Sequence, residues 1–112
     1  MKKYQLGEFE EIVLLTVGVL FDEAYGVSIK DEIERRTKRK VSVGALQSAL
    51  RRMETKGYLD SRRGETDPIR GGKPKRYFTI TAYGKKALEY TRDVRSELWD
   101  AIPDIAFEAR IA

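Results

Sequence analysis

The chain has 112 residues, of which 22 are Lys or Arg, 18 are Asp or Glu and none is Cys or His, so that its formal net charge is +4. The sequence therefore excludes disulfides, metal sites with Cys or His ligands, and enzymes with a Cys or His nucleophile. Hydrophobic residues at 41% and charged residues at 36% are typical of one folded, water-soluble domain rather than a disordered chain.

The N-terminal region is not typical of an exported or membrane-bound protein. It starts Met-Lys-Lys-Tyr-Gln, without the apolar core and cleavage site of a signal peptide. The longest apolar stretch, residues 12–21, has ten residues, whereas a membrane span needs about 20. We therefore expect a cytoplasmic protein that does not span a membrane.

Two helices are predicted in the first third of the chain. The first covers residues 7–22, where apolar residues form two adjacent stripes at helical spacing. Because so much of its surface is apolar, we expect this helix to lie at the centre of the core. The second helix covers residues 27–36 and is expected to bury Ile29 and Ile33.

A third helix is predicted at residues 43–56, between the N-cap Ser42 and Gly57, a residue type that commonly ends helices. Its core-facing stripe, at spacings of three and four, comprises Leu46, Ala49, Leu50 and Met53. The opposite, mostly polar face comprises Val43, Gln47, Ser48, Arg51, Arg52 and Thr55.

A β-hairpin is predicted after the third helix. Short strands are expected at residues 58–62 and 76–81, on either side of a polar loop at residues 63–74 that contains three Gly and two Pro. The two faces of the second strand are expected to carry Phe78 with Ile80 and Tyr77 with Thr79.

A fourth helix is predicted at residues 82–102, with Thr81 as its N-cap, and Pro103 is expected to end or kink it. Residues 104–112 could form a further helical turn or fray. The heptad seam of this helix, at alternating spacings of four and three, comprises Ala87, Thr91, Val94, Leu98, Ala101 and Ile105. The residues that widen its apolar surface are Leu88, Tyr90, Trp99 and Ile102.

The apolar surface of the fourth helix exceeds what one small domain can bury. We expect it to form a homodimer interface, and the candidate contact residues are Tyr90, Val94, Leu98, Trp99 and Ile102. The alternative is that this helix folds back over the first helix of its own chain. Trp99 either packs in the interface or lines a pocket for a flat, apolar effector.

The order of three helices, a hairpin and a long helix is typical of a winged helix-turn-helix. The predicted fold class is therefore mainly α with a small β-hairpin. It divides into a winged helix-turn-helix domain at residues 1–81 and a dimerisation helix with its tail at residues 82–112. In such a domain the third helix can enter the major groove of DNA, and the hairpin is a wing that can lie along phosphates or reach the minor groove.

The third helix carries candidate DNA contacts. Gln can make two hydrogen bonds to adenine and Arg can make two to guanine, while small residues allow a close approach to the bases. The candidates are Ser42, Gly44, Gln47, Ser48, Arg51 and Arg52. The alternative is an ordinary exposed helix face.

The wing loop has the densest positive charge. Residues 70–76 carry four cations, within a segment, residues 51–86, that has 11 basic and 4 acidic residues. Lys and Arg neutralise phosphates, and glycines let the backbone approach a ligand. The candidate phosphate contacts are Arg70, Gly72, Lys73, Lys75 and Arg76. The alternative is a soluble, flexible hairpin tip, whereas a Walker-type phosphate loop is excluded because its spacing is absent.

Five segments together resemble the PadR family of transcriptional regulators. They are Leu-Gly-Glu-Phe-Glu-Glu at 6–11, Ala-Tyr-Gly at 24–26, Val-Ser-Val-Gly-Ala-Leu at 41–46, Leu-Arg-Arg-Met-Glu-Thr-Lys-Gly at 50–57 and Arg-Gly-Gly-Lys-Pro-Lys-Arg-Tyr-Phe-Thr-Ile-Thr at 70–81. The resemblance implies a dimeric winged-helix regulator, usually a repressor, whose single C-terminal helix forms the dimer. Some relatives release DNA when they bind phenolic acids or hydrophobic drugs. The family commonly has Tyr where this chain has Gln47.

We therefore expect a dimeric, sequence-specific regulator that binds a palindromic operator on double-stranded DNA. Repression, and release by an aromatic or hydrophobic small molecule, are further hypotheses. The alternative is a winged-helix module that binds protein or RNA. An enzyme, a cofactor and a metal are not expected, since the nearest acidic cluster, Glu8, Glu10 and Glu11, lies where a helix N-terminus favours negative charge.

Overall fold

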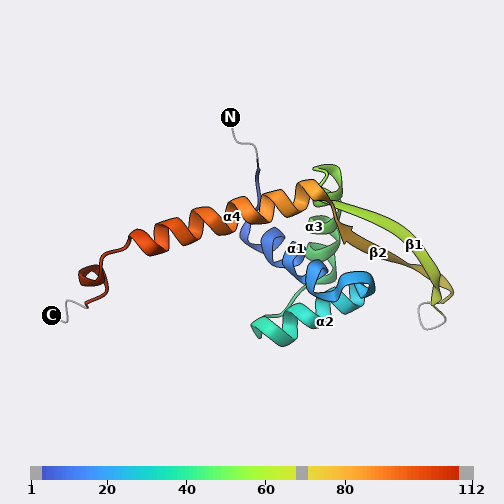
Figure 1. The fold of residues 1–112 in the computed structure, drawn as a ribbon. Helices are drawn as coiled ribbons and strands as arrows, with labels where there is room; N and C mark the ends of the chain where they lie inside the picture. Colours follow the sequence, from blue (N-terminus) through green and yellow to red (C-terminus); the bar gives the residue numbers. More distant parts are fainter. Residues whose placement is uncertain (1–3, 68–70, 109–112) are drawn as a thin grey trace.

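The computed structural model describes residues 4–67 and 71–108 and has the predicted order of elements (Figure 1). Its helices are α1 (Glu8–Leu20), α2 (Gly26–Thr37), α3 (Val43–Thr55) and α4 (Ala82–Ala101). Its strands are β1 (Leu59–Asp67) and β2 (Lys73–Ile80), and its short 3-10 turns are Phe21–Glu23 and Asp104–Phe107. The fold is a winged helix-turn-helix with a long C-terminal helix, as the sequence predicts.

One hydrophobic core joins α1, α2 and α3 with the base of the hairpin and the start of α4. The side chains predicted to face this core are all buried, and they are Ile29, Ile33, Leu46, Ala49, Leu50 and Met53. The predicted caps are also confirmed. The Ser42 hydroxyl accepts a hydrogen bond from the Ala45 N–H at 3.0 Å, and the Thr81 hydroxyl accepts one from the Gly84 N–H at 2.9 Å. These caps fix where α3 and α4 begin.

Helix α1 contacts α2, α3, β2 and α4, so it lies at the centre of the core as predicted, but part of its apolar surface is not covered. Its inward side chains, Val13, Leu14 and Val17, are buried, but Leu15 and Val19 are exposed. The reason is that α2 and α3 cover one side of α1, whereas α4 crosses only part of the other side before it leaves the domain. An apolar strip of α1 therefore remains at the surface beside the base of α4.

The hairpin is longer than predicted, and residues 63–74 are not a loop throughout. Strand β1 continues to Asp67 and β2 begins at Lys73, with an irregular register between Arg63 and Thr66. The Tyr77 ring lies against Gly64, where an added Cβ would come within 2.3 Å of a ring carbon. The absence of a side chain at Gly64 lets the two strands pair over this ring. The wing is thus a paired two-stranded ribbon along most of its length.

Both faces of β2 carry a buried aromatic residue. Phe78 belongs to the core, and Tyr77 on the opposite face is also buried, with 6% of its surface exposed. Its ring meets Tyr25 edge-on at a centroid distance of 5.6 Å, and the neighbouring Phe78 N–H donates to the Ala24 carbonyl at 2.8 Å. The base of the wing is therefore fastened to the residues that precede α2.

Helix α4 ends at Ala101, two residues before Pro103, as predicted. Its buried residues, Gly84 and Ala87, lie in its first two turns, and the rest projects away from the domain on the side opposite the hairpin (Figure 1). This arm explains a radius of gyration of 17.2 Å, where a compact chain of this length has about 13 Å. No helix in the described ranges combines the length and apolar character that a membrane crossing requires.

Candidate nucleic-acid interface

The exposed face of α3 and the base of β2 enclose a polar hollow. It has a volume of 230 Å³ and is lined by Gln47, Leu50, Arg51, Glu54, Arg76 and Phe78. Two of the lining side chains, Arg51 of α3 and Arg76 of β2, are 25 residues apart in sequence and both bring positive charge to this hollow. The structure thus brings together two predicted helix contacts and one predicted wing contact.

A chain of hydrogen bonds sets the position of Arg76. Its Nη1 donates to the Ser61 hydroxyl at 2.7 Å, and that hydroxyl is in turn bonded to the Glu54 carboxylate at the end of α3. Because Ser61 belongs to β1, this chain ties the base of both strands to the helix. The Arg76 guanidinium is consequently held beside the exposed face of α3, although the residue remains exposed to solvent.

Gln47 lies across the start of α2. An added Cβ on Gly26 would lie 3.2 Å from the Gln47 Nε2. Both residues also line a second hollow of 220 Å³ between α2 and α3. The predicted contacts nearest this place, Ser42 and Gly44, are exposed at the N-terminus of α3. The first turns of α2 and α3 therefore form a continuous surface.

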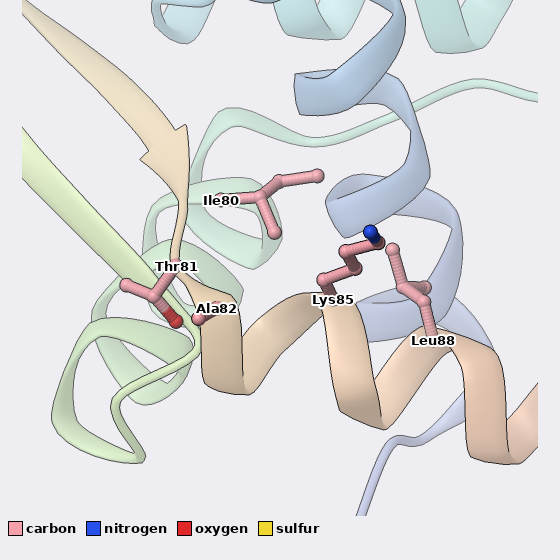
Figure 2. Close-up of a pocket in the computed structure, with 5 residues that line it drawn as sticks. All are labelled: Ile80, Thr81, Ala82, Lys85 and Leu88. Carbon is pink, nitrogen blue, oxygen red and sulfur yellow. The ribbon is translucent and has the colours of Figure 1, made fainter.

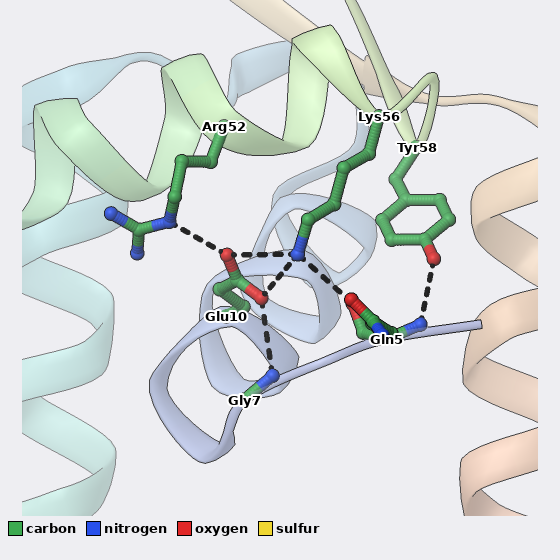
Figure 3. A network of polar contacts seen from close by, with 6 residues as sticks. All are labelled: Gln5, Gly7, Glu10, Arg52, Lys56 and Tyr58. Carbon is green, nitrogen blue, oxygen red and sulfur yellow. Dashed lines mark hydrogen bonds and ion pairs between the residues drawn. The ribbon is translucent and has the colours of Figure 1, made fainter. Parts of the chain in front are cut away.

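The opposite edge of α3 is tied to the start of α1 by an ionic network around Glu10 (Figure 3). The Glu10 carboxylate is 8% exposed and accepts hydrogen bonds from Arg52 Nε at 2.9 Å, Lys56 Nζ at 3.1 Å and the Gly7 N–H at 3.1 Å. Arg52, predicted to contact DNA, is therefore also an ion-pair partner within the protein. From the sequence, Glu10 is expected only to be a negative charge at a helix N-terminus. Its central position in this network depends on Arg52, which is 42 residues away in sequence.

Burial by itself raises the pKa of Glu10, but the hydrogen bonds that its carboxylate accepts from Arg52, the Gly7 N–H and Lys56 outweigh burial, so the pKa lies below its ordinary value of 4.5. The network should therefore stabilise the fold above pH 4.5 and stop doing so as the pH falls through the lowered pKa. We expect Glu10→Gln to lower the free energy of unfolding by about 1–2 kcal/mol at pH 7, a modest value because Arg52 is largely solvated. Urea titrations of both proteins from pH 7 to pH 3 test this, and a difference that is constant across the range would contradict it.

The middle of the wing is braced internally. The Lys75 Nζ lies 4.4 Å from the Tyr25 ring centroid and 4.0 Å from Glu65 Oε1, and its side chain is only 22% exposed. The Tyr77 hydroxyl donates to Glu65 Oε1 at 2.7 Å, and this hydrogen bond raises the pKa of Tyr77 to about 12. Lys75, a predicted phosphate contact, thus faces the protein more than the solvent.

Residues 71–73, on the β2 side of the wing tip, are exposed. Gly71 and Gly72 have φ values of 70° and 83°, in the left-handed region that favours glycine, and Lys73 beside them is exposed. Arg70, the remaining predicted wing contact, lies outside the described residues. Among the described residues, no three His, Cys, Asp or Glu side chains gather into a possible metal site.

Two cations near the start of α3 were not among the predicted site residues. Lys38 and Lys40 are exposed in the connection between α2 and α3, just before the N-cap Ser42. Between them, Arg39 is paired with Glu8 at 3.0 Å and lies over the Phe9 ring. The basic run Lys38-Arg39-Lys40 could have indicated these two cations in the sequence. Their position beside the N-terminus of α3, however, depends on the connection between α2 and α3.

The arm formed by α4 is largely uncovered. Of the five predicted interface residues, Leu98 and Trp99 are each 65% exposed, Tyr90 and Val94 are exposed, and Ile102 is partly buried. The Trp99 ring packs on Phe107 of the following 3-10 turn at a centroid distance of 5.5 Å. In the described structure this helix does not fold back over α1 along its whole length (Figure 1).

Two hollows lie at the base of the arm. One, of 270 Å³, is at the junction of β2 and α4 and is lined by Ile80, Thr81, Ala82, Lys85 and Leu88 (Figure 2). The other, of 470 Å³, lies between α1 and α4, with Leu15 and Leu88 among its lining residues. Trp99 lines neither hollow and lies farther along α4.

The chain matches the model of the transcriptional regulator PadR-like family over residues 14–90. A PadR-like transcription factor from Bacteroides fragilis is 24% identical, with a TM-score of 0.68 over 82% of this chain and 84% of that one. A PadR-like regulator from Bacillus cereus is 17% identical, with a TM-score of 0.71 over 90% and 93%. RosR of H. salinarum is 22% identical, with a TM-score of 0.69 over 92% and 86%. No curated protein matches the chain.

Proposed function

The chain belongs to the PadR-like family of transcriptional regulators, and from this premise we propose that it acts as a homodimer that binds duplex DNA in a sequence-specific manner. The observation that carries the proposal is the convergence of Gln47, Arg51 and Arg76 around one hollow at the junction of α3 and the wing. A helix flanked by a paired, basic ribbon fits the major groove and the adjoining phosphates.

The proposed contacts fall into two classes. Gln47 and Arg51 would read base edges, because Gln pairs with adenine and Arg with guanine in the major groove, and Gly44 and Ser48 would let the helix approach. Ser42, Arg52, Gly72, Lys73 and Arg76 would bind phosphates, which position the protein without reading sequence. Arg70 stays a prediction of the same kind. Lys75 would act mainly by stiffening the wing, since its ammonium group already faces Tyr25 and Glu65.

The proposed occupant of the exposed arm is a second copy of the chain. The arm and the turn that follows it present exposed apolar side chains, of which Val94, Leu98 and Ile105 lie on the predicted heptad seam and Tyr90, Trp99 and Phe107 lie beside it. An apolar strip of α1, with Leu15 and Val19, is also exposed beside it. Large exposed apolar surfaces on soluble proteins commonly mark interaction sites, which supports this proposal. We therefore assign residues 1–81 to DNA binding and residues 82–112 to dimerisation.

A dimer would present two copies of α3 to a palindromic operator, with the half-sites about 34 Å apart. A dimer bound over a promoter can block access to it, and we propose that the protein acts in this way as a repressor. Selection of bound duplexes from a random pool tests the dimer and the sequence preference together, because a recovered palindrome requires both. Transcription from a promoter that contains this sequence, with and without the protein, then tests repression.

Binding to DNA should depend strongly on salt. With several cations on phosphates, the logarithm of affinity should fall steeply as the logarithm of salt concentration rises. We expect Lys73→Ala to weaken all duplexes about equally and to reduce the salt slope by about 1, whereas Gln47→Ala should change the preference between sequences. Titrations of the selected duplex and a scrambled one, from low to high salt, check both variants.

Glu89→Gln, a charge change on α4 far from the wing, is the control for general charge effects. Duplex affinity that is flat with salt and indifferent to both Lys73→Ala and Gln47→Ala would favour a winged-helix module that binds protein. Tighter binding to a single-stranded or folded RNA of the same sequence would favour an RNA-binding module.

An aromatic or hydrophobic effector is proposed to bind beside Trp99 and change the separation of the two recognition helices. The support is an exposed indole on the arm that joins the subunits, stacked on Phe107. We expect such a ligand to quench the fluorescence of Trp99, which is the chain's one tryptophan, and to weaken operator binding over the same concentration range. Phenolic acids and planar drug-like compounds that change neither signal would contradict an effector site at Trp99.

A further inference from the structure

The exposed face of α3 has two edges with different surroundings. One edge carries Gln47 and Arg51 and faces the wing across the hollow that Arg76 also lines. The other edge carries Arg52 and faces the start of α1, where Glu10 forms an ion pair with Arg52. A helix in the major groove has a phosphate-bearing strand at each edge. In the proposed complex the wing contacts one of these strands, so a contact to the other strand has to come from a different part of the protein.

Glu10 holds Arg52 in a way that leaves its outer groups available. The carboxylate binds only Nε, at 2.9 Å, and no described residue accepts a hydrogen bond from Nη1 or Nη2. Figure 3 shows both Nη atoms on the side of the guanidinium that points away from Glu10. A guanidinium fixed through Nε keeps its outer N–H groups for an anion with two oxygens to offer, such as a phosphate.

Glu10 is itself rigidly placed. Besides Arg52 it accepts hydrogen bonds from the Gly7 N–H and from Lys56, whose Nζ lies 3.1 Å and 3.4 Å from the two carboxylate oxygens. Lys56 also donates to the Gln5 carbonyl at 3.1 Å, so its charge is directed inward (Figure 3). The two cations at the C-terminal end of α3 therefore have different roles. Lys56 helps to fix the Glu10 carboxylate, and this carboxylate holds Arg52 so that its Nη groups point outward.

We propose that Glu10 is a positioning residue for DNA binding, which orients Arg52 so that its Nη groups bind a phosphate on the strand opposite to the one that the wing contacts. The proposal rests on the proposed DNA-binding function. Contacts to both strands would fix the rotation of α3 about its own axis in the groove, and with it the register of Gln47 and Arg51 on the bases. Glu10 would thus affect sequence discrimination without touching DNA.

The experiment compares two carboxylates of the same helical turn in the full chain. Glu10→Gln and Glu11→Gln each remove one negative charge from the start of α1, and each carboxylate has an arginine partner. Glu11 pairs with Arg95 of α4 at 2.9 Å, away from α3. For each variant, the dissociation constants for the selected duplex and for a scrambled duplex are measured over a salt series. Their ratio reports discrimination rather than general charge attraction.

We expect Glu10→Gln to lower this ratio by roughly three- to tenfold, and Glu11→Gln to leave it unchanged. In an Arg52→Ala background, Glu10→Gln should have no further effect on the ratio, because the group that it orients is gone. Arg52→Lys keeps the positive charge, changes an exposed residue and leaves Glu10 in place. This variant therefore tests the proposal even if Glu10→Gln does not fold. It should lower the ratio as Arg52→Ala does, since a compact ammonium group lacks the planar guanidinium fork that can bind Glu10 through Nε and a phosphate through both Nη groups.

Three results would overturn the proposal while leaving DNA binding intact: an unchanged ratio for Glu10→Gln, wild-type discrimination by Arg52→Lys, or no effect of Arg52→Ala. A lower melting temperature of Glu10→Gln with an unchanged ratio would give Glu10 a structural role only. If the wild-type chain binds no duplex in a salt-dependent manner, and Lys73→Ala changes nothing, the proposed function itself fails and this proposal fails with it.

Discussion

Replacing Leu98 by Gln is expected to dissociate the proposed dimer and to remove most of its affinity for a palindromic operator. Leu98 is 65% exposed on α4 and lies on the predicted heptad seam. A symmetric interface loses this side chain twice, and each buried Leu contributes about 1.5–3 kcal/mol, so the dimer dissociation constant should rise by about 100-fold or more. Monomers bind half-sites separately and lose the gain in affinity that comes from linking two sites.

The matched control is Glu97→Gln, which introduces the same side chain one residue earlier, at a position off the seam. Sedimentation equilibrium and operator titrations at equal protein concentration measure both effects. We expect Leu98→Gln to sediment as a monomer at concentrations where the wild type and Glu97→Gln are dimers. A Leu98→Gln protein that stays dimeric and binds the operator normally would remove α4 from the interface, and the exposed strip of α1 would become the next candidate.

Replacing Gly84 by Ala is expected to cause a large loss of stability. Gly84 is buried in the first turn of α4, where an added Cβ would lie 2.3 Å from the Tyr58 carbonyl oxygen and 3.1 Å from Ile80 Cγ2. The nearest obstacle is backbone, which cannot move aside as a flexible side chain can. The helix must therefore shift away from the hairpin, and we expect the free energy of unfolding to fall by about 2–3 kcal/mol despite the better helix propensity of Ala.

Gly44→Ala is the control for this prediction, because nothing lies within 4 Å of an added Cβ at that helical position. It should raise the free energy of unfolding by about 0.5–1 kcal/mol. Urea titrations of the three proteins at one concentration and one pH give the comparison. If Gly84→Ala were as stable as Gly44→Ala, the packing of α4 against the hairpin would have to be looser than described.

Local patterns in the sequence were sufficient to predict most elements. The spacing of apolar residues in α3 predicted its buried stripe, and the hydroxyls of Ser42 and Thr81 predicted where α3 and α4 begin, because a helix cap involves residues only three apart. The strands were less well predicted, since the polar stretch around Gly64 resembles a loop. Its pairing depends on the Tyr77 ring across the hairpin, a partner that no local pattern identifies.

Sequence patterns were therefore enough to identify the family, the order of elements and the positions of Gln47, Arg51 and Lys73 on an exposed helix face and a wing tip. How the charged side chains are used follows from the packing of distant segments. It turned Lys75 against Tyr25, paired Arg52 with Glu10, brought Arg76 to the edge of α3 and left part of α1 exposed. The physical reason is that helix periods and caps depend on near neighbours. The partner of a charged side chain, in contrast, depends on which distant segments the packed core brings within about 4 Å.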